Sequence, residues 1–124
     1  MKRENKNYKI SAHFLFSDVI CKCKCGYSLI NRELLEKLEK ARMIACVPLI
    51  IDSWCRCKTY NATLKNSVPD SAHLKGEAVD IRAIKNYSII YRSLKKAGFI
   101  RIGKGKNFIH CDIDKDKPQV EWRY

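Results

Sequence analysis

Apolar residues recur at helical spacing in the first half of the chain. They lie three or four residues apart, which places them on one face of a helix. The positions are Ile30, Leu34, Leu38, Ala41 and Ala45. Acidic residues cluster near the start of this stretch and basic residues near its end, as the helix dipole favours. The pattern predicts an amphipathic helix that follows Tyr27-Ser28.

β-Branched and aliphatic runs predict strands further along the chain. The first covers residues 47–54 and the second residues 78–83. Two more, at 99–102 and 108–113, are separated by residues 103–107, a loop whose length and glycine content are typical of a hairpin. These runs predict a sheet whose last two strands are antiparallel neighbours.

A polar stretch and a second helix complete the pattern. Residues 58–72 are predicted to form a long loop, and loops of that length in small domains are usually functional. Ser88 is a plausible N-cap for a helix that ends at Gly98. The order of elements predicts an α+β fold with two main helices and a largely antiparallel sheet.

The chain has the size of one domain. Its 124 residues contain no internal repeat and no linker, so we expect a polar segment over residues 1–12 and one folded domain over residues 13–124. No apolar run is long enough for a transmembrane helix, and the charged N-terminus does not resemble a signal peptide. We therefore expect synthesis in the cytoplasm, with any export by another route.

The charge is strongly unbalanced. Lys and Arg number 25 against 13 Asp and Glu, which gives a formal net charge of +12. Such an excess favours anionic partners, including nucleic acid, anionic lipid and acidic cell-wall polymers. The basic residues are spread along the chain, so we interpret them mainly as a solvated surface.

Seven cysteines are many for this length. Without a signal peptide, free thiols are the expectation. The run Cys21-Lys22-Cys23-Lys24-Cys25 could hold a metal. The other cysteines form no C-x-x-C pair that would close a four-thiolate zinc site, so a structural thiolate site is the less favoured alternative.

Two histidines and an aspartate occupy unusual positions. His73 ends the predicted polar loop, and Asp80 follows on an apolar strand where an unpaired carboxylate would be costly. His110 lies within another apolar strand that should be close by. Two imidazoles and one carboxylate form a three-ligand zinc set with an open position, which suits metal-assisted hydrolysis. Arg56 could reach the same site, although a surface arginine is its simpler interpretation.

These residues form a pattern known from one enzyme family. The stretch Ser71-Ala72-His73-Leu74-Lys75-Gly76-Glu77-Ala78-Val79-Asp80 resembles the S-x-H-x-x-G-x-A-x-D signature of the M15 peptidases, which include zinc D-Ala-D-Ala carboxypeptidases, murein endopeptidases and phage endolysins. Residues 51–61 resemble the S-G-Y-R-C…N segment of that family, and residues 103–112 resemble its G-…-F-[IV]-H-x-D segment. Trp122 resembles a tryptophan near the end of many members.

The resemblance implies a specific site and fold. His73, Asp80 and His110 would bind one Zn²⁺ per chain, and Arg56 would bind substrate or the developing oxyanion. Ser71, the first residue of the signature, is a further candidate for substrate binding. The implied fold is the small α+β fold shared with the hedgehog signalling domain.

The general base is the weakest part of the resemblance. Positions at which some members have a glutamate or a histidine are occupied here by Asn107 and Phe108. Asp112 should point to the same face of its strand as His110, so it could act as base or support a ligand. Glu77 is a weaker candidate.

The resemblance implies hydrolysis of an amide bond in peptidoglycan stem peptides by a zinc-activated water. D-Ala-D-Ala carboxypeptidase and endopeptidase (endolysin) activities both remain open, and a non-catalytic zinc domain is a further alternative. A basic nucleic-acid-binding module would not explain the histidine and aspartate pattern, so we expect no specific nucleic acid partner. We expect a monomer that acts at the cell wall after phage-type release.

Overall fold

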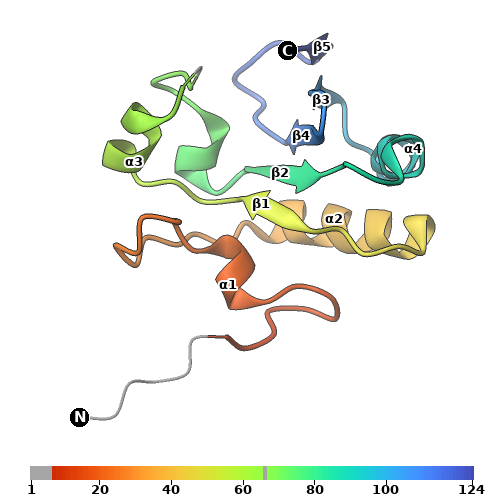
Figure 1. Cartoon of the computed structure of the whole chain (residues 1–124), viewed down its shortest axis with the longest axis horizontal. Helices are drawn as coiled ribbons and strands as arrows, with labels where there is room; N and C mark the ends of the chain where they lie inside the picture. The colour runs from red at the N-terminus through yellow and green to blue at the C-terminus, as the bar shows by residue number, and fades with distance from the viewer. Residues whose placement is uncertain (1–6, 66) are drawn as a thin grey trace.

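The computed structural model describes residues 7–65 and 67–124. In these residues four α-helices, one 3-10 helix and a five-stranded sheet form an α+β domain, as predicted (Figure 1). The helices are α1 (Phe16–Val19), α2 (Arg32–Ala45), α3 (Lys58–Thr63) and α4 (Tyr87–Ala97), with the 3-10 helix η1 at Ala72–Lys75. The strands are β1 (Ile51–Ser53), β2 (Ala78–Arg82), β3 (Arg101–Lys104), β4 (Phe108–Asp112) and β5 (Glu121–Arg123).

The sheet has the strand order β1-β2-β4-β3-β5. Pairing is antiparallel from β1 through β3, and β5 joins β3 in parallel. The predicted hairpin is therefore present as β3 and β4. The prediction of a largely antiparallel sheet is confirmed.

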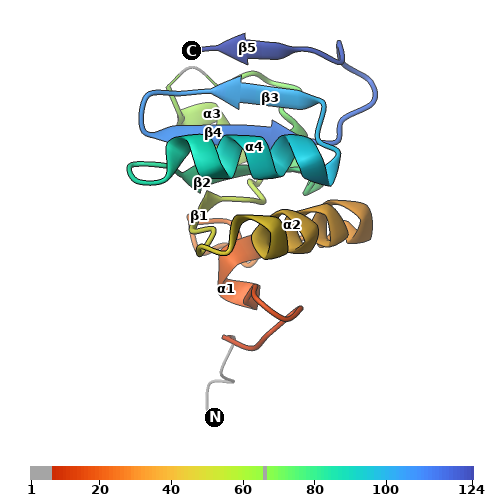
Figure 2. The ribbon, with the colours of Figure 1, turned by 90° about the vertical axis from the view of Figure 1, so that its right-hand side faces the viewer.

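One face of the sheet is covered by the two long helices. Figure 2 shows α2 and α4 side by side in front of the strands, and the two helices pack against each other. The predicted apolar stripe of α2 supplies Leu34, Leu38 and Ala41 to this core. On β2 and β4 the odd-numbered residues Val79, Ile81, Ile109 and Cys111 are fully buried in it. Because side chains alternate along a strand, the even-numbered residues of these two strands face the other side of the sheet.

Some boundaries differ from the sequence prediction. The first strand is only three residues long, Ile51–Ser53 rather than 47–54. The N-cap of α4 is Asn86, in a left-handed conformation with φ 63°, rather than Ser88. Part of the predicted loop 58–72 is helical, because the Cys57 sulfur accepts a hydrogen bond from the Tyr60 amide and caps α3. Strand β5 was not predicted, since three residues give no clear periodic signal.

The N-terminal segment is described in part. Residues 1–6 of the predicted polar segment lie outside the described residues. Further along, the Tyr8 ring stacks on Phe16 at a centroid distance of 5.1 Å, and the Ile10 amide donates to the Phe14 carbonyl. Residues 7–12 therefore dock on the start of α1. No helix in the described ranges has the length and apolar character that a membrane span requires.

Candidate active site

A row of register partners crosses the sheet on the face opposite α2 and α4. Asp80 on β2 is paired with Ser53 on β1 and with His110 on β4. Gly103 on β3 is paired with His110 and with Trp122 on β5. Directly opposed residues lie within contact distance on a common face. The sheet therefore places a carboxylate, an imidazole and an indole in one line.

His73 reaches this row from η1. Ser71 caps η1, because its Oγ accepts a hydrogen bond from the His73 amide at 3.2 Å. Gly76 ends η1 with φ 68°, and a Cβ atom there would lie 2.6 Å from the Leu29 carbonyl oxygen. The signature glycine is therefore required both for its left-handed backbone and for the close approach of Leu29.

The tautomer of His73 follows from its surroundings. Its Nδ1 lies 2.7 Å from the Trp54 carbonyl oxygen, which can only accept, so Nδ1 bears the hydrogen. Nε2 then has a free lone pair; it is buried without a hydrogen-bond partner and lies 3.4 Å from Asp80 Oδ2. Burial lowers the pKa of His73, which favours the neutral form that a metal ion needs.

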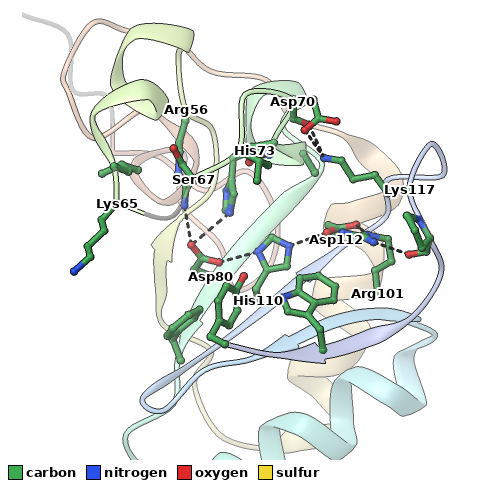
Figure 3. Close-up of a pocket in the computed structure, with 18 residues that line it drawn as sticks. Arg56, Lys65, Ser67, Asp70, His73, Asp80, Arg101, His110, Asp112 and Lys117 are labelled. Atoms are coloured by element: carbon green, nitrogen blue, oxygen red, sulfur yellow. Dashed lines mark hydrogen bonds and ion pairs between the residues drawn. The ribbon is translucent and has the colours of Figure 1, made fainter.

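His110 is held between two carboxylates (Figure 3). Its Nε2 lies 2.7 Å from Asp112 Oδ2, and its Nδ1 lies 3.0 Å from Asp80 Oδ1. Burial opposes the charged form, but Asp112 and Asp80 outweigh it and raise the pKa of His110. An imidazolium can donate to both carboxylates. A metal ion would take the place of the Nδ1 proton, because imidazole ligands bind metals in the deprotonated form.

Three predicted metal-binding residues thus converge. One donor atom each from His73, Asp80 and His110 lies within 4.8 Å of the others. Burial opposes ionisation of Asp80, but the hydrogen bond with His110 and the nearby imidazole of His73 outweigh it and hold its pKa far below the usual range. Two imidazoles and a carboxylate are the donor types that zinc prefers, and the unpartnered Nε2 of His73 gives such an ion a place to bind.

Arg56 lies beside this cluster. Its Nη2 donates to Asp80 Oδ2 at 3.0 Å, its Nη1 to Asn61 Oδ1 at 3.2 Å and its Nε to Ser53 Oγ at 3.2 Å. Its amide also donates to the His73 carbonyl at 3.1 Å. A cation is therefore held next to the candidate ligands, where the resemblance to the M15 family rather than the local sequence placed it.

Asp112 has both oxygens engaged. Oδ2 accepts from His110, while Oδ1 accepts from Arg101 Nε at 2.7 Å and from the Asp114 amide at 3.0 Å. These contacts outweigh the effect of burial and lower the pKa of Asp112. Asp112 lies on the side of the His110 ring opposite Asp80 (Figure 3), which is the arrangement of a carboxylate that orients a metal-binding imidazole.

The cluster opens into a pocket of about 790 Å³. Trp122 forms one wall, with its ring 5.4 Å from that of His110 and the Arg101 guanidinium 4.7 Å from the indole centroid. Gly103 makes room for this indole, because a Cβ there would lie 2.6 Å from it. Tyr124 also lines the pocket. Sequence reasoning missed Tyr124, since nothing local distinguishes it from an ordinary terminal residue.

The other candidates for substrate binding and for the general base either lie outside the pocket or make a contact that supports the fold. Ser71 lines the pocket and caps η1, so its assignment to substrate stays a prediction. Glu77 is absent from the pocket lining and lies 3.5 Å from Lys75 Nζ. Asn107 lines a smaller hollow beside Asp52 instead.

The cysteine run belongs to a group of donors that the sequence did not favour. Residues 22–25 form turns and bends, which bring Cys21, Cys23 and Cys25 together. Their sulfur atoms gather with that of Cys57 into a second group of potential metal ligands, at most 4.8 Å apart. Spacing along the sequence did not indicate the fourth member, which comes from a distant segment.

Comparison with known proteins agrees with this geometry. The family model described as Peptidase M15 matches residues 12–112, a span that includes Arg56, His73, Asp80 and His110. A search of curated proteins gave no significant match. The family match covers most of the chain and contains the residues that converge in the pocket. The chain therefore belongs to the Peptidase M15 family.

Proposed function

We propose that this M15 peptidase is a zinc enzyme that hydrolyses an amide bond in peptidoglycan stem peptides, with D-Ala-D-Ala carboxypeptidase activity as the first candidate. The observation that supports it best is the meeting of His73 Nε2, Asp80 and His110 Nδ1 in the pocket of a peptidase. Three protein ligands leave a coordination position for water or substrate, as in catalytic rather than structural zinc sites.

His73, Asp80 and His110 would hold the ion. When bound, zinc lowers the pKa of water to about 7 and polarises a carbonyl group. Asp112 accepts the Nε2 hydrogen of His110, so the Nδ1 atom on the Asp80 side would be the one available to an ion. We therefore assign Asp112 as a positioning residue, because a role as base would require it to give up one of its short hydrogen bonds.

Arg56 is the candidate for binding the substrate carbonyl. The guanidinium borders the pocket and is only slightly exposed, so its charge acts in an environment of reduced dielectric. A fixed cation beside the scissile bond stabilises the negative charge that develops on the carbonyl oxygen. Ser53 and Asn61 hold the side chain in place for this purpose.

The charge of the chain supports an acidic substrate. The pocket lining sets four basic residues, Arg56, Lys65, Arg101 and Lys117, against three carboxylates, and the whole chain has a formal charge of +12. Stem peptides carry carboxylates and lie within an anionic wall, so the basic surface would attract them. We further propose that the enzyme acts at the cell wall after phage-type release.

Defined muropeptides provide the test. The wild-type protein and His73→Ala would be compared for zinc content by native mass spectrometry and for hydrolysis by product mass. His13→Ala is the matched control, because His13 lies outside the pocket and pairs with Glu39. Chelator-sensitive loss of a single D-alanine, abolished in His73→Ala alone, would support the carboxypeptidase.

Other outcomes separate the alternatives. Release of a longer fragment would identify an endopeptidase of the same family. Zinc lost in His73→Ala without any hydrolysis by the wild type would favour a non-catalytic zinc domain. Equal zinc content in wild type and His73→Ala would contradict the proposed ligands.

A further inference from the structure

A second group of donors lies outside the pocket. Cys21, Cys23 and Cys25 come from the loop that follows α1, and Cys57 caps the start of α3. One sulfur atom from each lies within 4.8 Å of the other three. None of these residues lines the pocket or contributes to the proposed site of hydrolysis.

The loop conformation gathers alternate cysteines on one side. The Lys24 amide donates to the Cys21 carbonyl at 3.2 Å, which closes a turn. Lys24 has φ 70° and Gly26 has φ 92°, so both adopt the left-handed backbone conformation that tight turns use. The Cys21 amide then donates to the Tyr27 carbonyl at 2.9 Å, which closes the whole loop.

The sulfur separations fit a metal better than a disulfide. Cys21 Sγ and Cys23 Sγ are 3.4 Å apart, and Cys23 Sγ and Cys57 Sγ are 3.7 Å apart. A disulfide requires about 2.05 Å. Four thiolates at about 2.3 Å from a tetrahedral zinc ion lie about 3.8 Å from one another. The observed separations are close to that edge length.

Backbone amides point at the sulfur atoms. The Cys57 amide donates to Cys21 Sγ and the Tyr27 amide to Cys25 Sγ, both at 3.4 Å. The Tyr60 amide donates to Cys57 Sγ at 3.3 Å. Such bonds stabilise negative charge on sulfur and orient the donors, as outer hydrogen bonds do around metal sites. Lys22, Lys24 and Lys58 are neighbours of these cysteines in the sequence and supply compensating positive charge.

We propose that Cys21, Cys23, Cys25 and Cys57 bind a second divalent ion, zinc, in a closed tetrahedral thiolate site. Four protein ligands leave no position for substrate, so the role of the ion is structural. Thiolates are soft ligands that select zinc over calcium or magnesium. This proposal does not depend on the function of the pocket.

The position of the thiolate site suggests that the ion would stabilise the segment that holds Arg56. Cys57 follows Arg56 directly, and Arg56 reaches Asp80. The ion would tie the loop after α1 to the segment that holds Arg56. Removing it would therefore loosen Arg56 while leaving His73, Asp80 and His110 on their own elements.

Cobalt substitution tests this site separately from the pocket. Reduced wild-type protein loaded with Co²⁺ should show sulfur-to-cobalt charge-transfer absorption in the near ultraviolet, which an imidazole and carboxylate site lacks. Cys23→Ser and Cys25→Ser, which alter exposed side chains, should each abolish or strongly weaken that band. Cys46→Ser, at an exposed cysteine outside the group, is the matched control and should retain it.

The two proposed metal sites can be tested independently of each other. Native mass spectrometry should find two zinc ions in the wild type, one in Cys25→Ser and one in His73→Ala. His73→Ala should keep the charge-transfer band even if the proposed hydrolysis is wrong. A wild-type protein without this band, a band unchanged in both cysteine variants, or a Cys21–Cys23 disulfide in the freshly purified protein would overturn the thiolate site.

Discussion

Asp80 and His110 are register partners on adjacent antiparallel strands, and 3.0 Å separates Asp80 Oδ1 from His110 Nδ1. The pairing of β2 with β4 therefore sets the spacing between two candidate ligands. His73 comes from η1, which is close to β2 in the sequence and packs against it. The candidate metal centre depends on one strand pair and one short helix, so we expect it to be rigid.

Replacing Asp112 should lower the affinity for the metal ion, although the three candidate ligands themselves remain. Asp112→Asn removes the charge that orients His110 and pairs with Arg101. Loss of such a supporting carboxylate typically costs about 10- to 100-fold in metal affinity or activity. Titration with a competing chelator measures the affinity. Asp116→Asn, at a 90% exposed side chain, should leave it unchanged.

If Asp112 is instead the base, Asp112→Asn will keep its zinc affinity. Activity will then fall far below that of the wild type at every zinc concentration. This pattern would contradict the positioning role.

Substitution of Arg56 should affect turnover more than zinc content. Arg56→Ala removes the cation beside Asp80, and the loss of a transition-state donor typically lowers kcat by about 10²- to 10³-fold. Arg56→Lys should recover only part of the rate, because lysine lacks the planar fork that bonds Ser53 and Asn61. Steady-state kinetics on a muropeptide, with zinc measured in parallel, checks both variants.

Arg82→Ala is the control for this series, because Arg82 pairs with Asp52 and does not line the pocket of the candidate site. An Arg56→Ala enzyme with normal kcat/KM would remove Arg56 from the mechanism.

Gly103→Ala should displace Trp122. The added methyl group would lie 2.6 Å from the indole, so the ring must move away from His110. Overpacking of this kind typically costs about 1–3 kcal/mol in the free energy of unfolding. Urea denaturation of Gly103→Ala, Trp122→Ala and the double variant measures the coupling. The double variant should recover part of the loss, and strict additivity would show that the two residues do not clash.

Asp114 should make the fold sensitive to acid. Its side chain is 1% exposed, and ion pairs with Lys75 and Lys117 outweigh burial and lower its pKa. A carboxyl group whose folded pKa lies below its unfolded value stabilises the fold above the unfolded pKa, about 3.9. That contribution is lost as the pH falls through the folded pKa. Urea denaturation between about pH 6 and pH 2 follows this loss.

In Asp114→Asn the free energy of unfolding should be lower near neutral pH and should depend less on pH below about 4. Asp116→Asn should keep the wild-type dependence, because that side chain is 90% exposed. An unchanged acid profile in Asp114→Asn would show that Asp114 does not contribute.

Local patterns in the sequence were sufficient for the main elements. The apolar spacing of Leu34, Leu38, Ala41 and Ala45 predicted α2 and its buried face, whereas Ile30 lies before the helix and is exposed. β-Branched runs predicted β2, β3 and β4. These patterns repeat within a few residues, so they can be recognised without knowledge of the tertiary structure. The polar residues Asp80 and His110 were conspicuous for the same reason, since they interrupt apolar strands.

Contacts between distant segments had no such signal. Asp112 and Arg101 meet only because β3 pairs with β4, and Cys57 joins Cys21 only because the chain after β1 returns to the loop after α1. The loop that gathers residues 21–25 is closed by hydrogen bonds between Lys24 and Cys21 and between Cys21 and Tyr27, which the spacing of the cysteines did not indicate. The sequence alone determined which chemistry the chain contains. The tertiary structure decided which donors share a site, because long-range pairing depends on the whole packed fold rather than on neighbours in sequence.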